Sequence, residues 1–448
     1  MPLFSSEKLK QIKEREAPAA GRPRVLLVDD EPANLRMMAA LLERDFELLE
    51  APDGQAAWEL LESLNDSESL ACIVSDQRMP RLTGVELFER VHPLMPAVIR
   101  IIVTGFVDVD AIIDSINKAE IYKFIVKPFD ANDFKLTVKR AIEAHEMNRR
   151  LDAHHRELEA YNAAFRRFVP GEFLQQLDRP SILEVQLGDN ALHDMTVMFT
   201  DIVDFSDLSE HMQPHENFRF LNSYLSRVGP IVRAHNGFVD KYLGDGVMGL
   251  FPQSRRHALD AALDFRRELV EYNAGRARAG YRPIDVGIGI HSGVLMLGTI
   301  GEKERMDTTV IADAVNVASR LESLTRSFHT GIIVSANVTS RLSEHDAYSL
   351  RPLGRVRVKG REAYVEILEL FDADEPSLAD HKRRTTDAFA SALGAFQTGD
   401  FETAGRLFEE IAAMHQDDGP AAYYRARCTA LTLNAPLEWS GVDILETR

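Results

Sequence analysis

Residues 24–145 alternate between short apolar runs and amphipathic segments, and no other feature of the chain constrains its fold as strongly. The apolar runs are residues 25–28, 70–75, 99–103 and 122–126, and the amphipathic segments are residues 34–44, 55–64, 85–91, 109–117 and 131–144. Strands that alternate with helices pair as a parallel sheet with helices on both faces. Residues 23–142 are therefore predicted to form a doubly wound α/β domain, after an N-terminal lead at residues 1–22.

Polar residues stand where the apolar runs end. They are Asp29, Asp30, Asp76, Thr104 and Lys127. An aspartate in such a place is often only a helix N-cap. In open α/β sheets, however, ligands bind at the carboxyl ends of the strands. Three carboxylates there can hold one Mg²⁺, and the hydroxyl and ammonium groups can contact a phosphoryl oxygen.

With these five residues in this order, residues 23–142 resemble a response-regulator receiver domain. The resemblance implies a five-stranded parallel sheet and a histidine kinase that phosphorylates Asp76. The implied site has Asp29, Asp30 and Asp76 around one Mg²⁺, Thr104 and Lys127 on the phosphoaspartate, and Phe124 as the aromatic switch residue. A receiver-like fold that is never phosphorylated is the alternative.

A helix is predicted over residues 143–168, within a linker at residues 143–193. Its larger side chains recur at spacings of three and four, which is the a/d seam of a coiled coil. The seam is Ala144, Met147, Leu151, His154, Leu158, Tyr161, Phe165 and Phe168. We expect a short parallel coiled coil; the alternative is a single amphipathic helix packed on its own domain.

The pattern changes over residues 194–372. Helices are expected at residues 216–235, 256–273 and 313–325, and strands at 195–199, 238–243, 247–251, 285–291, 294–300, 331–335, 355–359 and 364–370. An Asp-Gly turn between the second and third of these strands is a strong hairpin signal. Successive strands between helices favour an α+β sandwich with one mostly antiparallel sheet.

Two aspartates in this region, Asp201 and Asp245, stand at the ends of predicted strands. Carboxylates at neighbouring strand ends can hold Mg²⁺ against a polyphosphate. Lys241 lies four residues before the second aspartate on the same hairpin, so the site can also contact a base.

Five stretches here resemble, in order, the catalytic domain of class III nucleotidyl cyclases, whose core is ferredoxin-like. They are residues 199–206, 240–246, 287–293, 315–320 and 358–360. The resemblance implies that the ribose 3′-hydroxyl of ATP attacks the α-phosphorus and that pyrophosphate leaves. In the implied site, Asp201, Asp245 and the Ile202 carbonyl bind two Mg²⁺ or Mn²⁺ ions. Lys241 and Thr309 bind adenine, and Asn316 binds the ribose. Arg320 contacts the transferring phosphorus, and Lys359 binds the terminal phosphates.

Lys241 and Thr309 favour adenine over guanine. A lysine can donate to adenine N1, whereas guanine N1 carries a proton, and a threonine hydroxyl can accept from the adenine amino group. The pair resembles the bacterial adenylyl subtype. Three departures from the family pattern affect activity level, metal preference and loop geometry: Asp204, Thr308 and Ala312.

The cyclase resemblance also implies a homodimer, because the metal aspartates of one chain meet the asparagine and arginine of its partner. The expected protein is a two-component response regulator with adenylate cyclase output, in which a change in the receiver reaches the cyclase through the helical linker. The alternatives are a guanylate cyclase and an inert, phospho-switched dimeric binding protein.

Residues 377–448 are predicted to be helical, with the period of one tetratricopeptide-like unit. They are either a cap on the preceding domain or a module for a protein partner. The net charge of −18 argues against partners such as nucleic acid or an anionic membrane. No apolar run approaches the roughly 20 residues that span a bilayer, so we expect a cytoplasmic protein.

Overall fold

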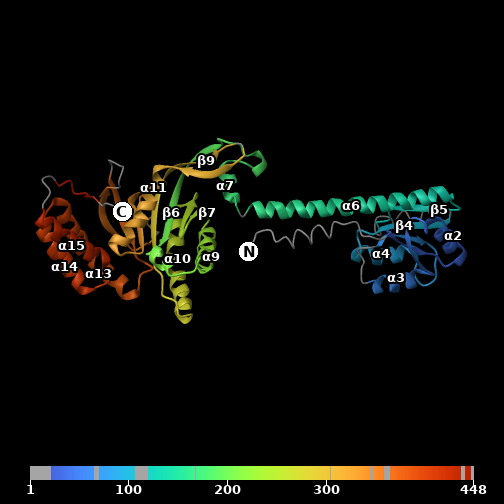
Figure 1. Ribbon diagram of the computed structural model, residues 1–448, viewed down its shortest axis with the longest axis horizontal. Coiled ribbons are helices and arrows are strands. Elements are labelled where there is room, and N and C mark those ends of the chain that lie inside the picture. The colour runs from blue at the N-terminus through green and yellow to red at the C-terminus, as the bar shows by residue number, and fades with distance from the viewer. Residues whose placement is uncertain are drawn as a thin grey trace. The chain divides into compact units, whose positions relative to one another are not determined.

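The structure is a computed structural model that describes residues 22–64, 70–105, 120–166, 168–302, 304–343, 347–357, 364–434 and 439–444. The chain divides into two compact units, Met1–Ala164 and Phe165–Arg448. Figure 1 labels many of their helices and strands. Each unit has its own sheet and its own hydrophobic cores.

The first unit contains a five-stranded parallel sheet in the order β2-β1-β3-β4-β5. Its strands are β1 (Arg24–Val28), β2 (Glu47–Ala51), β3 (Leu70–Asp76), β4 (Ile99–Gly105) and β5 (Lys123–Lys127). The described helices are α2 (Pro32–Leu42), α3 (Gly54–Ser63), α4 (Gly84–Leu94) and α6 (Ala131–Phe165). The predicted doubly wound fold is confirmed, while the segment expected at residues 109–117 lies outside the described residues.

Side chains of β1 alternate between two cores, as the pleat of a strand requires. Leu26 and Val28 pack with α3 and α4, whereas Val25 and Leu27 pack with α2 and the start of α6. Both faces of the sheet are therefore covered. The edge strand β2 was not marked in the sequence, because its five residues include two exposed glutamates that interrupt the apolar pattern.

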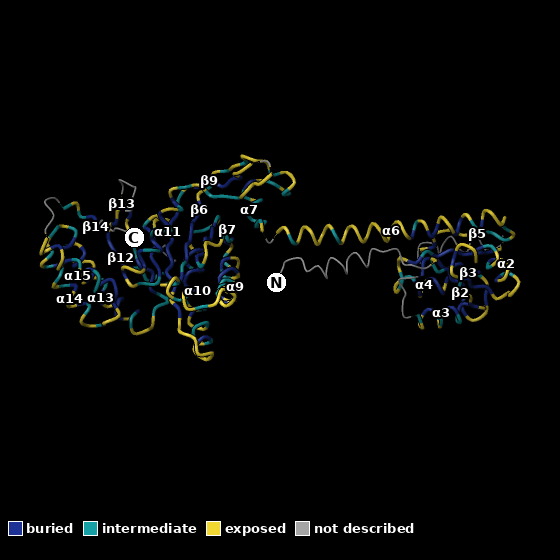
Figure 2. The backbone as a smooth tube through the Cα atoms, viewed as in Figure 1, coloured by how far each residue is buried: buried dark blue, intermediate teal, exposed yellow. Residues whose placement is uncertain are grey.

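Helix α6 continues well beyond the core of the first unit. Its buried residues end at His145, and the large seam side chains that follow are about half or more exposed. Figure 2 draws most of the later part of α6 in the exposed colour. The alternative of a helix packed on its own domain is therefore wrong for this part of α6, which leaves an apolar seam facing solvent in the single chain.

The second unit is built on a nine-stranded mixed sheet. Eight strands follow the order β14-β12-β13-β11-β9-β6-β8-β7, and β10 pairs with β9. The strands are β6 (Asn190–Ile202), β7 (Phe238–Leu243), β8 (Gly246–Phe251), β9 (Val286–Gly301), β10 (Met306–Ile311), β11 (Ile332–Ser335), β12 (Leu350–Arg357), β13 (Tyr364–Leu370) and β14 (Asp443–Ile444). Most pairings are antiparallel, and only β11 with β9 and β12 with β14 run parallel.

Helices cover both faces of this sheet. One face packs on α9 (Pro214–Ala234) and α10 (Arg255–Arg278), and the other on α7 (Gly171–Gln176) and α11 (Asp313–Phe328). Short helices α8 (Phe205–Glu210) and α12 (Ala336–Thr339) and the 3₁₀ helix Ile182–Glu184 complete the described helical segments before residue 376.

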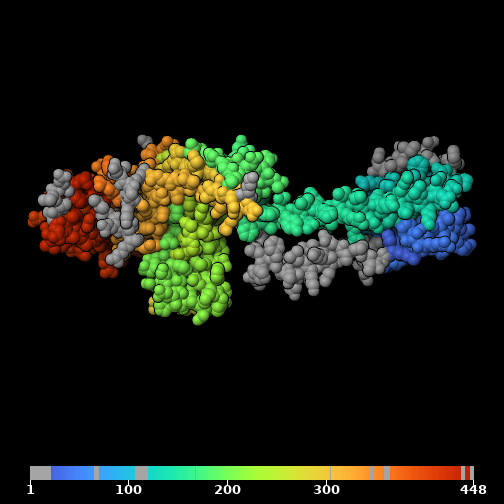
Figure 3. All heavy atoms as spheres, turned by 45° about the horizontal axis from the view of Figure 1, so that its top comes forward, coloured from blue at the N-terminus to red at the C-terminus, as the bar shows by residue number. Residues whose placement is uncertain are grey.

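Three further helices, α13 (Pro376–Thr398), α14 (Phe401–Met414) and α15 (Gly419–Leu433), share a core with α11, β12 and β13. Figure 3 shows them in red against the orange region of the later strands. They bury the apolar face that the sequence predicts, and they do so on their own chain. This is the arrangement of a cap.

Two of the differences from the expected elements concern the central strands. Residues 285–291 and 294–300 form one strand, β9, because β6 pairs with it without a break from Val286 to Gly298. The hairpin loop between β7 and β8 is Gly244-Asp245 rather than Asp245-Gly246, and Gly244 has φ +71°. Positive φ at the first loop position is the pattern of a type II′ turn.

Candidate active site and candidate phosphorylation site

Asp201 and Asp245 lie together at one end of the central strands. Asp201 is the penultimate residue of β6, and Asp245 lies in the turn that leads into the neighbouring β8. The Asp245 carboxylate accepts a hydrogen bond from the Ile202 amide at 3.2 Å. Gly246 leaves room for this arrangement, since a Cβ there would lie 3.2 Å from Asp201 Oδ1.

The two carboxylates repel each other, as a shared cation site requires. Burial raises the pKa of Asp201 to about 6, and the neighbouring charge of Asp245 adds to the rise. Arg326 opposes the shift through an ion pair, with its Nη2 2.5 Å from Asp201 Oδ2. Arg326 therefore provides a positive charge beside Asp201.

Sequence reasoning missed Arg326 and its neighbour Glu322. Both lie on α11, one turn apart, and Arg326 Nη2 is 3.4 Å from Glu322 Oε1. Burial raises the pKa of Glu322 to about 7; Arg326 lowers it, and the charge of Asp201 adds to the rise. The i, i+4 spacing of a glutamate and an arginine was the available signal, but surface helices carry such pairs commonly.

Helix α11 reaches this site because two glycines let it pack closely on β9. A Cβ at Gly289 would lie 2.1 Å from the Glu322 backbone nitrogen, and one at Gly287 would lie 2.2 Å from Thr325 Oγ1. Any larger residue would push the helix outward. The glycines of this stretch thus set the distance between Glu322 and the strand that pairs with β6.

Asn316 and Arg320 also lie on α11, and Asn316 is exposed. At 3.6 residues per turn, the side that carries them is roughly 120° around the helix from the side that carries Glu322 and Arg326. The structure therefore puts the two pairs on different sides of one helix. The roles expected of Asn316 and Arg320 remain predictions.

The residues expected to read the base lie on β7 and β10. Lys241 is half-buried, and its Nζ is 3.3 Å from Oδ2 of Asp240, whose side chain is fully buried. Asp240 is the extra residue where the pairing of β7 with β8 shifts register, and such bulges re-aim neighbouring side chains. Thr309 pairs with Gly298 of β9. Lys359 lies outside the described residues.

The three departures from the family pattern lie on three different parts of the cyclase unit. Asp204 takes the left-handed conformation, φ 54° and ψ 36°, immediately before α8. Glycine adopts this conformation without strain, which explains why the family pattern has glycine there. Ala312 precedes α11 and makes no side-chain capping bond, and Thr308 pairs with Thr299.

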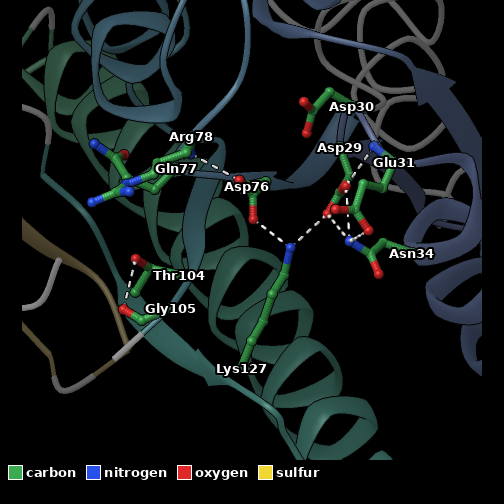
Figure 4. A pocket seen from close by; sticks show the side chains of 10 residues that line it. All are labelled: Asp29, Asp30, Glu31, Asn34, Asp76, Gln77, Arg78, Thr104, Gly105 and Lys127. Atoms are coloured by element: carbon green, nitrogen blue, oxygen red, sulfur yellow. Dashed lines mark hydrogen bonds and ion pairs between the residues drawn. The ribbon is translucent and has the colours of Figure 1, made fainter. Parts of the chain in front are cut away.

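The five polar residues singled out in the first unit line one pocket of about 330 Å³ (Figure 4). Its lining is Asp29, Asp30, Glu31, Asn34, Asp76, Gln77, Arg78, Thr104, Gly105 and Lys127. Lys127 Nζ lies between two carboxylates, 2.8 Å from Asp29 Oδ2 and ion-paired with Asp76. The strand ends thus bring together all five polar residues that the sequence indicated.

Electrostatics in this pocket centre on Lys127. Burial lowers its pKa, but hydrogen bonds to Asp29 and Asp76 outweigh burial, so the pKa is raised. Burial raises the pKa of Asp76 despite the lysine. Phe124 is 37% exposed on β5, so its ring is accessible, as a switch residue must be.

Both acidic sites have the donor chemistry for a hard cation, because carboxylate and carbonyl oxygens are the ligands of Mg²⁺. In each, a basic side chain lies against the carboxylates: Lys127 on Asp29 and Asp76, and Arg326 on Asp201. Within the described residues, no three Asp, Glu, His or Cys side chains are close enough together to hold a metal. Each site therefore offers carboxylate oxygens to a cation that displaces or joins the basic group, without a preformed cluster of three carboxylates in the described residues.

Comparisons with known proteins find a family model that matches part of each unit. The family model described as "Response regulator receiver domain" matches residues 25–139, and that described as "Adenylate and Guanylate cyclase catalytic domain" matches residues 188–369. An open parallel sheet with an acidic pocket and a mixed sheet with paired aspartates thus define a receiver and a nucleotidyl cyclase. The chain joins a response-regulator receiver domain to a class III nucleotidyl cyclase domain.

Three relatives are named adenylate cyclases, and two others are named hydrogenase transcriptional regulatory proteins. Adenylate cyclase from Anabaena cylindrica is 38% identical over 236 residues, 51% of this chain and 47% of that protein. Adenylate cyclase 1 from Rhizobium meliloti is 32% identical over 214 residues, 46% of this chain and 31% of that protein. A solved structure of a bacterial light-regulated adenylyl cyclase is 29% identical and covers 44% of this chain and 99% of that chain, with a TM-score of 0.37.

The chain spans about half or less of the length of these curated relatives. In the described part of the chain, no helix combines the length and apolar character needed to cross a membrane.

Proposed function

We propose that this chain is a response regulator with adenylate cyclase output, which converts ATP to cyclic AMP and pyrophosphate. The observation that carries the proposal is the adjoining pair Asp201 and Asp245, with Lys241 on the strand that leads into the same hairpin. A lysine donor suits adenine N1, and a wrong base would leave a buried polar group unpaired. The adenylate cyclase names of three relatives support the same substrate.

Asp201, Asp245 and the Ile202 carbonyl would hold Mg²⁺ or Mn²⁺ in this proposal. When bound, such ions lower the pKa of the ribose 3′-hydroxyl and neutralise the departing pyrophosphate. The chain's own carboxylates keep these charges at the end of β6. In the receiver, Asp29, Asp30 and Asp76 would hold one Mg²⁺.

The remaining roles follow from residue chemistry. Asn316 orients the ribose, and Arg320 stabilises charge on the transferring phosphorus, as a guanidinium does in phosphoryl transfer. Lys359 binds the terminal phosphates, and Lys241 and Thr309 bind adenine. We assign the receiver to residues 23–142, the linker and connector to 143–193, and the cyclase to 194–372.

A homodimer completes the site in this proposal. Asn316 and Arg320 lie on a different side of α11 from Arg326, which pairs with Asp201 of the same chain, as a site shared between two chains requires. The exposed seam of α6, with Leu151 59% and Leu158 61% exposed, suits a parallel coiled coil that holds two chains together.

Turnover of ATP and GTP, measured side by side with Mg²⁺ and with Mn²⁺, tests the activity. Cyclic AMP should form, cyclic GTP should form far more slowly, and Asp201→Ala should abolish both. Absence of cyclic AMP with either metal contradicts the proposal, and preferred turnover of GTP makes the protein a guanylate cyclase instead.

Dimerisation through α6 has its own test. Leu151→Asp with Leu158→Asp should convert the dimer to monomer in sedimentation velocity and lower turnover in parallel. Ala153→Asp with Ala160→Asp is the matched control, because both alanines are exposed on the same helix outside the seam. Equal loss of dimer in the two double variants argues against the seam.

Regulation by Asp76 is tested with an acyl-phosphate donor and a receiver variant. The donor should change cyclic AMP production in the wild-type protein and leave Asp76→Asn unaffected. An equal response in both proteins removes the receiver pocket from the mechanism.

A further inference from the structure

Arg326 contacts Asp201, a candidate metal ligand of the cyclase unit, as Lys127 contacts Asp29 and Asp76 in the receiver pocket. We propose that Arg326 is an internal competing cation, which holds Asp201 in the metal-free enzyme and is displaced when a divalent metal binds. The inference rests on the proposed function only in taking Asp201 as a metal ligand. Arg326 is thus a positioning residue that sets how readily the site takes up metal.

The contact has the geometry of a direct substitute for a metal. Arg326 Nη2 donates to Asp201 Oδ2 and forms an ion pair with it. A guanidinium stays protonated at any physiological pH, so the competing charge is permanent. A metal ion that uses the same carboxylate oxygen must first break this pair.

The local charge balance explains why such a cation is needed. Asp201, Asp245 and Glu322 act on one another electrostatically and are partly or fully buried. Half-buried carboxylates that lack a counter-charge destabilise a fold. Arg326 offsets part of this repulsion before metal arrives, and a divalent ion offsets more of it afterwards.

Arg326 also pairs with Glu322, and this second ion pair can remain when Arg326 leaves Asp201. Glu322 lies one helical turn earlier on α11, 3.4 Å away, and its side chain is only 7% exposed. The arginine side chain itself is 39% exposed, so it has space to move toward solvent. Displacement therefore leaves the guanidinium paired with Glu322 rather than without a counter-charge.

Helix α11 gives the contact a second consequence. The same helix carries Asn316 and Arg320 roughly 120° away around its axis, the side proposed to serve the partner subunit. The ion pair of Arg326 therefore links this helix to Asp201 of the same chain. Metal uptake at one site would release a restraint on the helix that supplies the other.

Mn²⁺ binding to the full-length protein without nucleotide tests the proposal, with electron paramagnetic resonance of the free ion as readout. Arg326→Gln should bind Mn²⁺ about tenfold more tightly at the cyclase site, equivalent to about 1.4 kcal/mol. Arg326→Lys should fall between wild type and Arg326→Gln, because it keeps the charge but loses the planar fork. Binding that remains in Asp201→Asn measures the receiver site and is subtracted.

Arg406→Gln is the control, because it removes the same charge from an exposed ion pair with Glu410 on α14. It should leave Mn²⁺ affinity unchanged, and thermal unfolding should confirm that all variants are folded. Unchanged or weaker Asp201-dependent binding in Arg326→Gln overturns the inference, as does absence of such binding in both proteins. Failure of the proposed function would instead appear as absence of cyclic AMP in the wild-type protein.

Discussion

Arg351 of β12 and Asp418, the N-cap of α15, form a bidentate ion pair of 2.9 and 2.7 Å between side chains with no exposed surface. The two residues are 67 positions apart in the chain. Arg351 also pairs with Glu369, which in turn accepts from Lys382 of α13 at 2.8 Å. A buried charge network therefore fixes the C-terminal helices on the cyclase sheet.

Breaking the Arg351–Asp418 pair should detach or loosen the C-terminal helices. Asp418→Asn removes one of the two carboxylates that pair with the buried guanidinium of Arg351 and leaves only Glu369, which should cost up to about 3–5 kcal/mol. Trp439, which donates to the Phe396 carbonyl at 3.0 Å, reports on this region by fluorescence once Trp58 is replaced with Phe. Asp417→Asn is the control, because the Asp417 carboxylate is next to Asp418 in the chain but is exposed. An equal effect of both substitutions would refute the role of the Arg351–Asp418 pair.

Acid should weaken the same region through His381. Burial lowers the pKa of His381, and Asp418 offsets this only in part, while His415 and Arg351 lower it further. The unfolded chain therefore binds a proton first as pH falls below about 6.5. The free energy of unfolding should decrease there by at most about 1.4 kcal/mol per pH unit.

Urea unfolding at several pH values, with Trp439 as the reporter, measures this slope. His381→Gln should flatten it below pH 6.5, whereas His215→Gln should not, because His215 is exposed in the first turn of α9. The same slope in wild type and His381→Gln would assign the acid sensitivity to another group.

Asp240 should influence which base Lys241 selects. Burial raises the pKa of Asp240, and the ion pair with Lys241 opposes the rise. Asp240→Asn removes this pair, so the KM for ATP should increase about tenfold, equivalent to about 1.4 kcal/mol, with little change for GTP. Asp307→Asn removes a charge that also acts on Asp240 and should have a smaller effect. Equal effects would mean that local charge, and not the pair, matters.

The backbone at Asp204 predicts an unusual substitution pattern. Because this residue has positive φ, Asp204→Ala should lower the free energy of unfolding by about 1 kcal/mol. Asp204→Gly should be nearly neutral, since relief of strain is offset by greater freedom of the unfolded chain. Asp207→Ala, inside α8, is the comparison for loss of an exposed aspartate. A greater loss with glycine than with alanine would contradict this account.

Close packing of α11 on β9 predicts opposite effects of one substitution at two glycines. Gly289→Ala forces a Cβ against the backbone of Glu322 and should destabilise the cyclase unit by about 1–3 kcal/mol. Gly275→Ala, in α10 with no atom within 4 Å of the added Cβ, should stabilise by about 0.4–1 kcal/mol. Calorimetric unfolding of both variants measures these changes in stability. Destabilisation by both substitutions would contradict the packing argument.

Local pattern was enough to predict much of the fold and several site residues. The strand ends that carry Asp29, Asp76 and Lys127 could be read because each follows a short apolar run, and parallel strands bring their ends to one edge. The β7–β8 hairpin was predicted from its turn residues. These features depend on neighbours within a few positions, so one sequence suffices.

Other features depend on segments that are distant in the chain. Nothing near Arg326 indicates that it reaches Asp201, 125 positions earlier, and Arg351 looks like a strand-edge arginine until Asp418 lies against it. The continuity of β9 depends on its pairing with β6. The formation of the β2 edge strand depends on its pairing with β1.

By itself, the sequence determined where several strands end, which residues are candidates for the chemistry and which families the two domains resemble, because periodicity and turn chemistry are local. Only the tertiary structure decided which basic residue neutralises Asp201, how the C-terminal helices dock and which face of α6 stays exposed. Ion pairs and packing act through space at a few ångströms, and the chain brings those partners together only when it folds.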